Sequence, residues 1–194
     1  MRDDSTQARV REFHEAFGHP VAEVPTLLTL ERAKARVKWT IDEVEREFIE
    51  AIEAADIVGA YDALIDARYF IEGTAVEMGL DLDAGFGVVH GCNMAKLGPD
   101  GKPVPPDADG KVQKPEGWEP PEAKLAVLIE KQAADGQIYL WARDAANAYL
   151  RGETYELPAM RPAQMVKVMQ GVSVILNATD KAAFRRWADE WAAS

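Results

Sequence analysis

The chain contains 194 residues, with 33 acidic and 22 basic side chains and a formal net charge of −11 at pH 7. So acidic a protein is not expected to bind nucleic acid directly, because neutralising backbone phosphates requires a basic surface. It has no apolar stretch of membrane-spanning length, no apolar signal-peptide region near Met1 and a single cysteine, so we expect a cytoplasmic protein without an internal disulfide.

Apolar residues recur at helical spacing through the first half of the chain, which predicts an all-α fold. Gly18 and Gly79 follow two of these periodic segments, as glycines that end helices commonly do. Asp56 either caps the second long helix or belongs to a short turn before it. The four helices predicted here cover residues 6–17, 28–55 (with an interruption near Trp39–Thr40), 61–78 and 82–95.

Five carboxylates border the apolar stripes of the two long helices. Glu43, Glu47 and Glu50 stand at positions i, i+4 and i+7, which share one face of a helix. Asp62 and Asp66 stand at i and i+4 on the next helix. If the two helices pack antiparallel, the five carboxylates meet along one seam, where they would repel each other unless a cation lay between them. Divalent cations with oxygen ligands suit such a seam.

A solvated helix face is the simpler interpretation of charges at helical spacing. The aspartates weaken it, because Asp62 and Asp66 interrupt a helix that aspartate does not favour and lie beside its most apolar part. On the first helix, the stripe formed by Ile41, Val44 and Phe48 is predicted to be buried, with the glutamates alongside it. We therefore keep both interpretations, the metal site and the solvated face.

The composition changes over residues 98–121, which are rich in proline and glycine and cannot form a helix. A loop of this length is usually functional or a linker. It carries Lys102, Lys111 and Lys114 in an otherwise acidic protein, together with Trp118. Loosely held segments whose charge is opposite to that of a ligand are suited to closing over it, although these lysines could equally pair with surface carboxylates.

After this long Pro/Gly-rich loop the chain is helical again. It shows no constellation of catalytic residues there, so a helical C-terminal extension for packing or oligomerisation is expected. We predict two parts, a catalytic domain over residues 1–121 and the extension over residues 122–194. The helices predicted in the extension cover residues 122–134, 137–151, 162–178 and 180–193.

Several segments, in this order, carry a family pattern. They are Val10–Gly18, Arg36–Ala51, Asp62–Gly79, Val89–Lys96 and Gly110–Trp118. Together they resemble the MazG-like all-α nucleoside triphosphate pyrophosphohydrolases, in the phosphoribosyl-ATP pyrophosphohydrolase-like branch found in bacteria and phages. Each motif is weak by itself, and their order makes the resemblance specific. It covers roughly residues 8–121, whereas the remainder of the chain resembles no family.

The resemblance implies a helical bundle that hydrolyses a (deoxy)nucleoside triphosphate to the monophosphate and pyrophosphate. In the family this reaction serves nucleotide-pool cleansing or precursor control, and dGTP, GTP and dUTP are candidate substrates. The implied cofactor is Mg²⁺ or Mn²⁺, which suits hard oxygen ligands. The implied assembly is a homodimer or homotetramer, with no nucleic-acid or membrane partner.

The resemblance also implies roles for single residues. The implied metal ligands are Glu43, Glu47, Glu50, Asp62 and Asp66. Catalysis is assigned to Glu43, Glu47 and Glu50, and whichever of Glu43 and Glu50 is not a ligand would act on the attacking water. The implied substrate-binding residues are Asn93, Lys96 and Lys114, with Trp39 and Trp118 stacking on the base. Each tryptophan is also a suitable core residue.

Two positions depart from the family motifs, since Val44 and Ala63 stand where glutamates are expected. These departures leave a second function open, that of a non-catalytic nucleotide- or metal-binding regulator on the same scaffold. The histidines give no zinc pattern, because His14, His19 and His90 are scattered. Pyrophosphate release from a panel of nucleotides separates the two functions.

Overall fold

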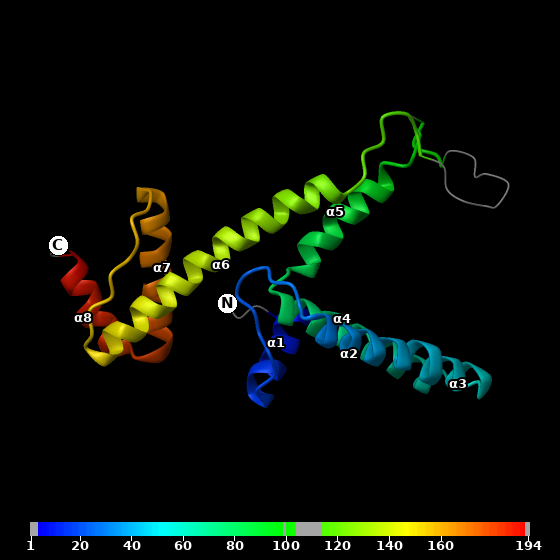
Figure 1. Ribbon diagram of the computed structural model, residues 1–194, viewed down its shortest axis with the longest axis horizontal. Coiled ribbons are helices and arrows are strands. Elements are labelled where there is room, and N and C mark those ends of the chain that lie inside the picture. The colour runs from blue at the N-terminus through cyan, green and yellow to red at the C-terminus, as the bar shows by residue number, and fades with distance from the viewer. Residues whose placement is uncertain (1–3, 99, 104–113, 193–194) are drawn as a thin grey trace. The chain divides into compact units, whose positions relative to one another are not determined.

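The structure, a computed structural model, describes residues 4–98, 100–103 and 114–192 (Figure 1). Within these ranges the chain forms helices and no β-strand, apart from an isolated bridge between Leu97 and Pro103. The predicted all-α fold is therefore confirmed. No helix in the described part is long and apolar enough to cross a membrane. The elements are α1 (Thr6–Phe17), α2 (Leu30–Ile41), the π-helix η1 (Asp42–Glu47), α3 (Phe48–Glu53), α4 (Ile57–Met78), α5 (Leu82–Met94), α6 (Glu122–Arg151), α7 (Pro162–Thr179) and α8 (Lys181–Ala192).

Two compact units make up the chain, Met1–Gln132 and Ala133–Ser194. The boundary lies inside α6, so each unit contains part of this helix. Every residue of the candidate site described below belongs to the first unit.

The ends of α1 and α4 follow from local chemistry. Gly18 and Gly79 close them with φ angles of 69° and 65°, in the left-handed region that glycine adopts without strain. Asp56 caps α4, because its side chain accepts the backbone N–H groups of Val58 and of the next residue. Of the two alternatives for Asp56, the helix cap is therefore the one found, and α4 begins at Ile57.

A helical hairpin forms the centre of the first unit. The row made of α2, η1 and α3 runs antiparallel to α4, and α1 packs on α4 as well (Figure 1). Small side chains fill the contact, since the buried apolar residues on these two rows are mainly alanines: Ala51, Ala60, Ala63, Ala67 and Ala75. Alanines let the helix backbones come close, so polar side chains at the edge of the contact can meet those of the opposite row.

The first row contains a π-helix where the sequence predicted an interruption near Trp39–Thr40. The break lies slightly later, at Asp42–Glu47, where the Phe48 N–H donates to the Glu43 carbonyl five residues back. The extra residue in this turn rotates the side chains around it. The predicted buried stripe is accordingly wrong in part, because Ile41 is 46% exposed and Val44 is 44% exposed. π-helical turns occur frequently at functional sites.

The second unit has its own apolar core, made by the end of α6, α7 and α8. Its buried residues are Ala142, Ala146, Val168, Val172 and Leu176. The sequence predicted two helices here, divided near residue 136, but α6 is continuous through Gly136. A glycine costs a helix only about 1 kcal/mol relative to alanine, which flanking helix-forming residues offset.

Candidate functional site

Four of the five predicted carboxylates, Glu43, Glu47, Asp62 and Asp66, lie near one another on η1 and α4. Burial raises the pKa of Glu43, and the negative charges of Glu47 and Asp66 raise it further. Burial also raises the pKa of Asp66, followed by the charges of Asp62 and Glu47. Glu47 and Asp66 are therefore close enough to Glu43 to oppose its ionisation, and Asp62 and Glu47 oppose that of Asp66. Asp62 and Asp66 are exposed, whereas Glu43 and Glu47 are half-buried.

The cluster fits a hard divalent cation in its chemistry. All donors are carboxylate oxygens, which Mg²⁺ and Mn²⁺ prefer, and the Glu43 Oε2 atom is buried without a hydrogen-bond partner. A buried acceptor without a partner is unfavourable, so a proton or a cation is expected beside it. As they are arranged, however, no three or more His, Cys, Asp or Glu side chains of the described residues converge enough to hold a metal ion.

Arg46 occupies part of this negative region. Its Nη2 atom lies 2.6 Å from Glu47 Oε1, and its Nη1 atom lies 4.0 Å from Glu50 Oε2. The positive charge of Arg46 also opposes the rise in the pKa of Glu43. Glu50 is 65% exposed in its side chain and pairs with Arg46, so the structure does not bring it into the cluster. The sequence analysis gave Arg46 no role, although it stands beside two of the glutamates.

An aromatic pair lies one helical turn away from the carboxylates. Trp39 precedes Glu43 by four residues and Phe70 follows Asp66 by four residues, on the two antiparallel rows. The Trp39 and Phe70 ring centroids are 6.0 Å apart. They border a cavity of about 300 Å³ lined by Phe13, His14, His19, Arg32, Arg36, Trp39, Tyr69 and Phe70. Small-molecule sites begin at about this volume.

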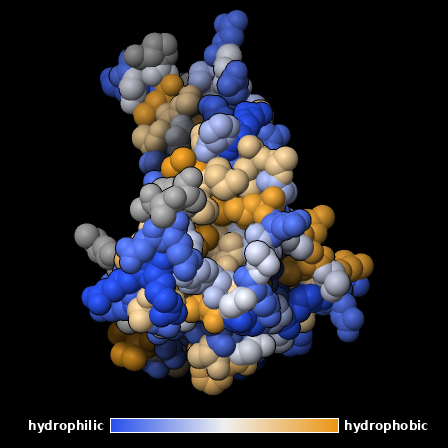
Figure 2. Space-filling view, turned by 90° about the vertical axis from the view of Figure 1, so that its left-hand side faces the viewer, coloured by the Kyte–Doolittle hydropathy of each residue, from blue (hydrophilic) through white to orange (hydrophobic). Residues whose placement is uncertain are grey.

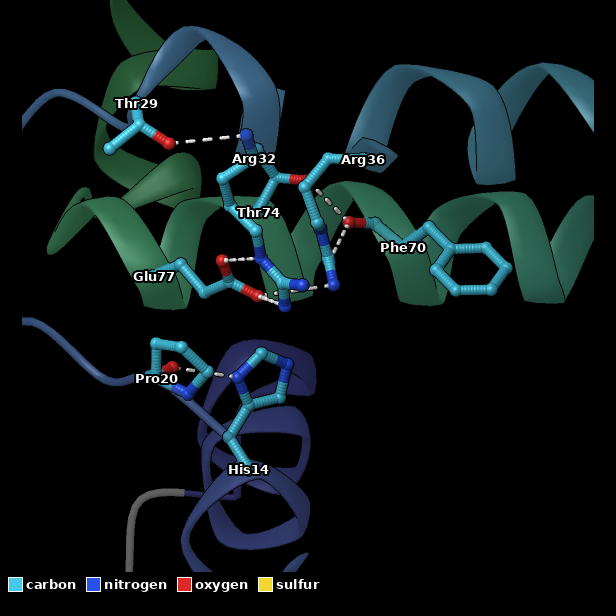
Figure 3. Close-up of polar contacts among 8 residues, drawn as sticks. All are labelled: His14, Pro20, Thr29, Arg32, Arg36, Phe70, Thr74 and Glu77. Atoms are coloured by element: carbon cyan, nitrogen blue, oxygen red, sulfur yellow. Dashed lines mark hydrogen bonds and ion pairs between the residues drawn. The ribbon is translucent and has the colours of Figure 1, made fainter. Parts of the chain in front are cut away.

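Arg32 and Arg36 form a basic side of the cavity, and both contact one buried carboxylate (Figure 3). Glu77 has a fully buried side chain, which receives two hydrogen bonds of 2.6 and 2.7 Å from Arg32. Arg36 lies 3.3 Å from the same carboxylate and donates to Thr74 and to the Phe70 carbonyl. Two arginines face one carboxylate, so a positive charge is left over beside the cavity.

The charges of Glu77, Arg32 and Arg36 shift the pKa values of Glu77 and Arg36. Burial alone would raise the pKa of Glu77, but the Arg32 hydrogen bonds and the charges of Arg36 and Arg32 hold it below its ordinary value. Burial lowers the pKa of Arg36, and although Glu77 opposes this, the charge of Arg32 lowers it further. An acceptor from a ligand would thus find an incompletely neutralised guanidinium here.

His14 completes this side of the cavity from α1 (Figure 3). It is only 4% exposed, and its Nδ1 atom lies 2.9 Å from the Pro20 carbonyl oxygen. Its Nε2 atom and Arg36 Nη2 both lie against Gly73 of α4, so close that a Cβ atom at this position would collide with them. A side chain larger than hydrogen at position 73 would fill the space between them.

Gly73→Ala is expected to lower the free energy of unfolding by about 1–3 kcal/mol, the usual cost of overpacking. Alanine normally favours a helix by about 1 kcal/mol over glycine, but its Cβ atom would collide with Arg36, which three groups hold in place. Urea denaturation measures the difference. Gly85→Ala on α5 is the control, because nothing lies within 4 Å of its added Cβ atom. Equal stabilisation by both substitutions would contradict this packing.

The remaining predicted substrate residues gather around Trp118, beyond the end of α5. Lys96 donates to Asn93 Oδ1 at 2.8 Å, and the Lys96 and Lys114 amines lie 5.5 and 4.3 Å from the Trp118 ring centroid. The Trp118 indole N–H donates to the Cys92 carbonyl at 2.7 Å. Within the described ranges, no hydrogen bond or ion pair joins this basic cluster to the carboxylates of η1 and α4. Lys111, also singled out in the loop, lies outside the described residues.

Sequence reasoning missed the residues on the basic side of the cavity. His14 was considered only as part of a family motif and as a histidine outside any zinc pattern, and Arg36 only as part of a motif. One local signal was available, because Arg32, Arg36 and Trp39 share a helix face at spacings of four and three residues. Both guanidinium groups lie over the Trp39 ring, at 5.1 and 5.6 Å from its centroid.

Comparison with known proteins identifies the family of this chain. Residues 10–93 match the family model of phosphoribosyl-ATP pyrophosphohydrolase. A crystal structure of a protein from Exiguobacterium sp. 255-15, provisionally named an NTP pyrophosphohydrolase, is 35% identical in sequence over 67% of this chain and 97% of that chain, with a TM-score of 0.40. No curated protein shows significant similarity. The chain belongs to the phosphoribosyl-ATP pyrophosphohydrolase family, among the MazG-like all-α pyrophosphohydrolases.

Proposed function

We propose that this pyrophosphohydrolase acts on a (deoxy)nucleoside triphosphate and releases the monophosphate and pyrophosphate, with Mg²⁺ or Mn²⁺ as cofactor. Nucleotide-pool cleansing or precursor control is the role that such an activity would serve. One observation carries the proposal, namely that a carboxylate cluster and an aromatic-lined cavity lie one helical turn apart on the same two rows of helix. A nucleotide has its phosphates and its base at a comparable separation. The relative provisionally named an NTP pyrophosphohydrolase supports the same substrate class.

Each group of residues has its own role in the proposed hydrolysis. Glu43, Glu47, Asp62 and Asp66 would hold the divalent cation, for which Glu47 must turn away from Arg46. When bound, such a cation neutralises phosphate charge and makes hydroxide available near neutral pH. A glutamate that is not a ligand, Glu43 or Glu50, would orient the water. The Trp39 and Phe70 rings would bind the base by stacking.

Pyrophosphate release from a panel of dNTPs and NTPs tests the proposal directly. With Mg²⁺ or Mn²⁺ present, we expect equimolar monophosphate and pyrophosphate from at least one nucleotide, and no orthophosphate. Addition of EDTA should stop the release. Orthophosphate as the first product would show cleavage at another phosphate and contradict the proposed reaction.

A non-catalytic regulator is the second candidate. The absence of a converged metal set among the described residues favours it, as do the departures at Val44 and Ala63. Calorimetric titration with a nucleotide distinguishes it, because a regulator binds without turnover. Nucleotide binding with no pyrophosphate release under any metal would establish this candidate.

We also infer a homodimer or homotetramer, in which a second copy brings its basic cluster to the carboxylates. Large apolar side chains of the first row are exposed: Val37 (55%), Ile41 (46%), Val44 (44%), Ile49 (47%) and Ile52 (55%). Apolar residues are visible at the surface on the face drawn in Figure 2. Exposed apolar rows of this kind mark interfaces between proteins. A monomeric mass in solution scattering, at concentrations where the protein is active, would contradict this assembly.

Lys114→Ala is expected to raise KM for the nucleotide by about ten-fold or more, the worth of one charged hydrogen bond to phosphate. Lys114 is exposed and, among the described residues, contacts the Trp118 ring, so the fold should not depend on it. Metal affinity should change little. Lys102→Ala is the matched control, because it removes another exposed lysine from the same loop. If KM and kcat of Lys114→Ala were unchanged, the loop would not contact the nucleotide through Lys114 and would be only a spacer.

A further inference from the structure

We propose that the cavity beside the carboxylates selects nucleobases that carry a carbonyl group next to a ring N–H, with His14 and Arg36 as the selecting residues. The inference rests on the proposed function and goes further by naming the class of base. The cavity is lined by two pairs of neighbouring rings, Trp39 with Phe70 and Phe13 with His19, which are stacked at 5.8 Å between ring centroids. A planar heterocycle packs favourably against aromatic rings.

His14 offers this ring a hydrogen-bond acceptor. The partner of its Nδ1 atom is the Pro20 carbonyl oxygen, which can only accept, so the Nδ1 atom carries a proton. In the neutral imidazole the Nε2 atom then holds a lone pair. This atom lines the cavity in an almost fully buried side chain and has no hydrogen-bond partner in the described structure. A ligand that donates an N–H to it would give this acceptor a partner.

Arg36 offers a donor beside that acceptor. Its Nη2 atom already donates to the Phe70 carbonyl and has a second N–H left. The Nη2 atom and His14 Nε2 flank the place of the missing Gly73 side chain, so one ligand edge can reach both. The positive charge that Glu77 leaves unneutralised attracts an oxygen acceptor and repels the positive end of an amino group.

A donor next to a strong acceptor is the edge that keto bases present. Guanine and hypoxanthine carry a carbonyl oxygen beside a ring N–H, and so do uracil and thymine. Adenine and cytosine carry an amino group beside an unprotonated ring nitrogen at the same edge. The charged guanidinium therefore favours the first group, since a carbonyl oxygen is the stronger partner for it.

Inosine and adenosine form a matched pair of probes, because they differ only at this edge. Neither has a phosphate, so binding needs no metal and no catalysis. We expect inosine to bind about ten-fold or more tightly than adenosine, as one good pair of base contacts provides. The shift of the Trp39 indole N–H signal in NMR titrations measures both affinities. Equal affinities, tighter adenosine binding or no binding of either nucleoside would overturn the proposal.

The variant His14→Asn tests whether His14 is responsible for the preference for inosine. The asparagine amide can still donate to the Pro20 carbonyl but has no atom where Nε2 stood, so the ratio of inosine to adenosine affinity should fall towards one. His90→Asn is the control, because His90 is an exposed histidine of α5 that stacks on Phe86. If His14→Asn kept the parent ratio of inosine to adenosine affinity, His14 would not be a residue that selects the base. A protein that prefers inosine but releases no pyrophosphate would refute the proposed reaction and retain the base preference.

Discussion

Replacement of Glu47 or Asp66 by alanine is expected to reduce pyrophosphate release more than about 100-fold, since even the loss of residues that only support metal ligands costs 10–100-fold. Both carboxylates act on Glu43 and on each other across the η1–α4 contact. Without either of them, too few oxygens would be left to hold a divalent cation. Kinetics over a range of Mn²⁺ concentrations, together with a metal titration by calorimetry, measure the loss.

Glu45→Ala is the control for this prediction, because Glu45 is an exposed residue of the same π-helix outside the cluster. It should retain near-normal turnover and metal affinity. Near-normal turnover in Glu47→Ala or Asp66→Ala would instead refute the metal-site assignment.

The same substitutions should leave the metal-free protein folded, and more stable at neutral pH. The folded-state pKa values of Glu43 and Asp66 lie above their ordinary values. Protonation is thus favoured by folding, so these groups make the free energy of unfolding fall as the pH rises from about 4. Glu47→Ala removes a negative charge that contributes to both shifts, and its stability should fall less over this pH range. Urea denaturation at several pH values without metal tests the sign.

Glu77→Gln is expected to lower the free energy of unfolding by about 3 kcal/mol or more, the cost of leaving a buried charge without its partner. Arg36, with a side chain only 7% exposed, would lose its counter-ion, and Arg32 would lose two charged hydrogen bonds. Urea denaturation at pH 7 measures the change. The cavity should lose its shape with it, so the nucleoside affinity of the folded protein should fall too.

The pH dependence of this prediction has the opposite sign to that of the carboxylate cluster. The folded-state pKa of Glu77 lies below its ordinary value, so its contribution is present above about pH 4 and is lost as the pH falls through the lowered pKa. Glu77→Gln should therefore lose less stability than the parent protein on acidification.

Glu72→Gln provides the matched control. Glu72 is also a buried glutamate of α4, but it pairs at 3.4 Å with Arg68, whose side chain is 55% exposed and keeps its contact with water. Its loss should cost clearly less than that of Glu77. Equal effects of the two substitutions would mean that the Arg32–Glu77–Arg36 group adds nothing beyond the burial of a carboxylate.

Helix ends and helix faces could be predicted from the sequence because they depend on neighbouring residues. The bounds of α1 agree with those predicted, and Gly18 and Gly79 end their helices through a backbone angle that glycine adopts freely. The adjacency of Glu43 and Asp66 followed from helical periodicity together with the expectation of an antiparallel pair. These properties are local, or need only one assumption about packing.

Other features depend on contacts between residues far apart in the chain, and only the folded structure reveals them. The π-turn at Asp42–Glu47 lies in the row that packs on α4, and Glu50 beyond it lies 4.0 Å from Arg46 rather than in the carboxylate cluster. The basic side of the cavity joins His14 of α1 to Arg36 of α2 and Glu77 of α4. Periodicity gives the face of each helix but neither its depth nor its register against another helix, and side-chain packing in three dimensions sets both.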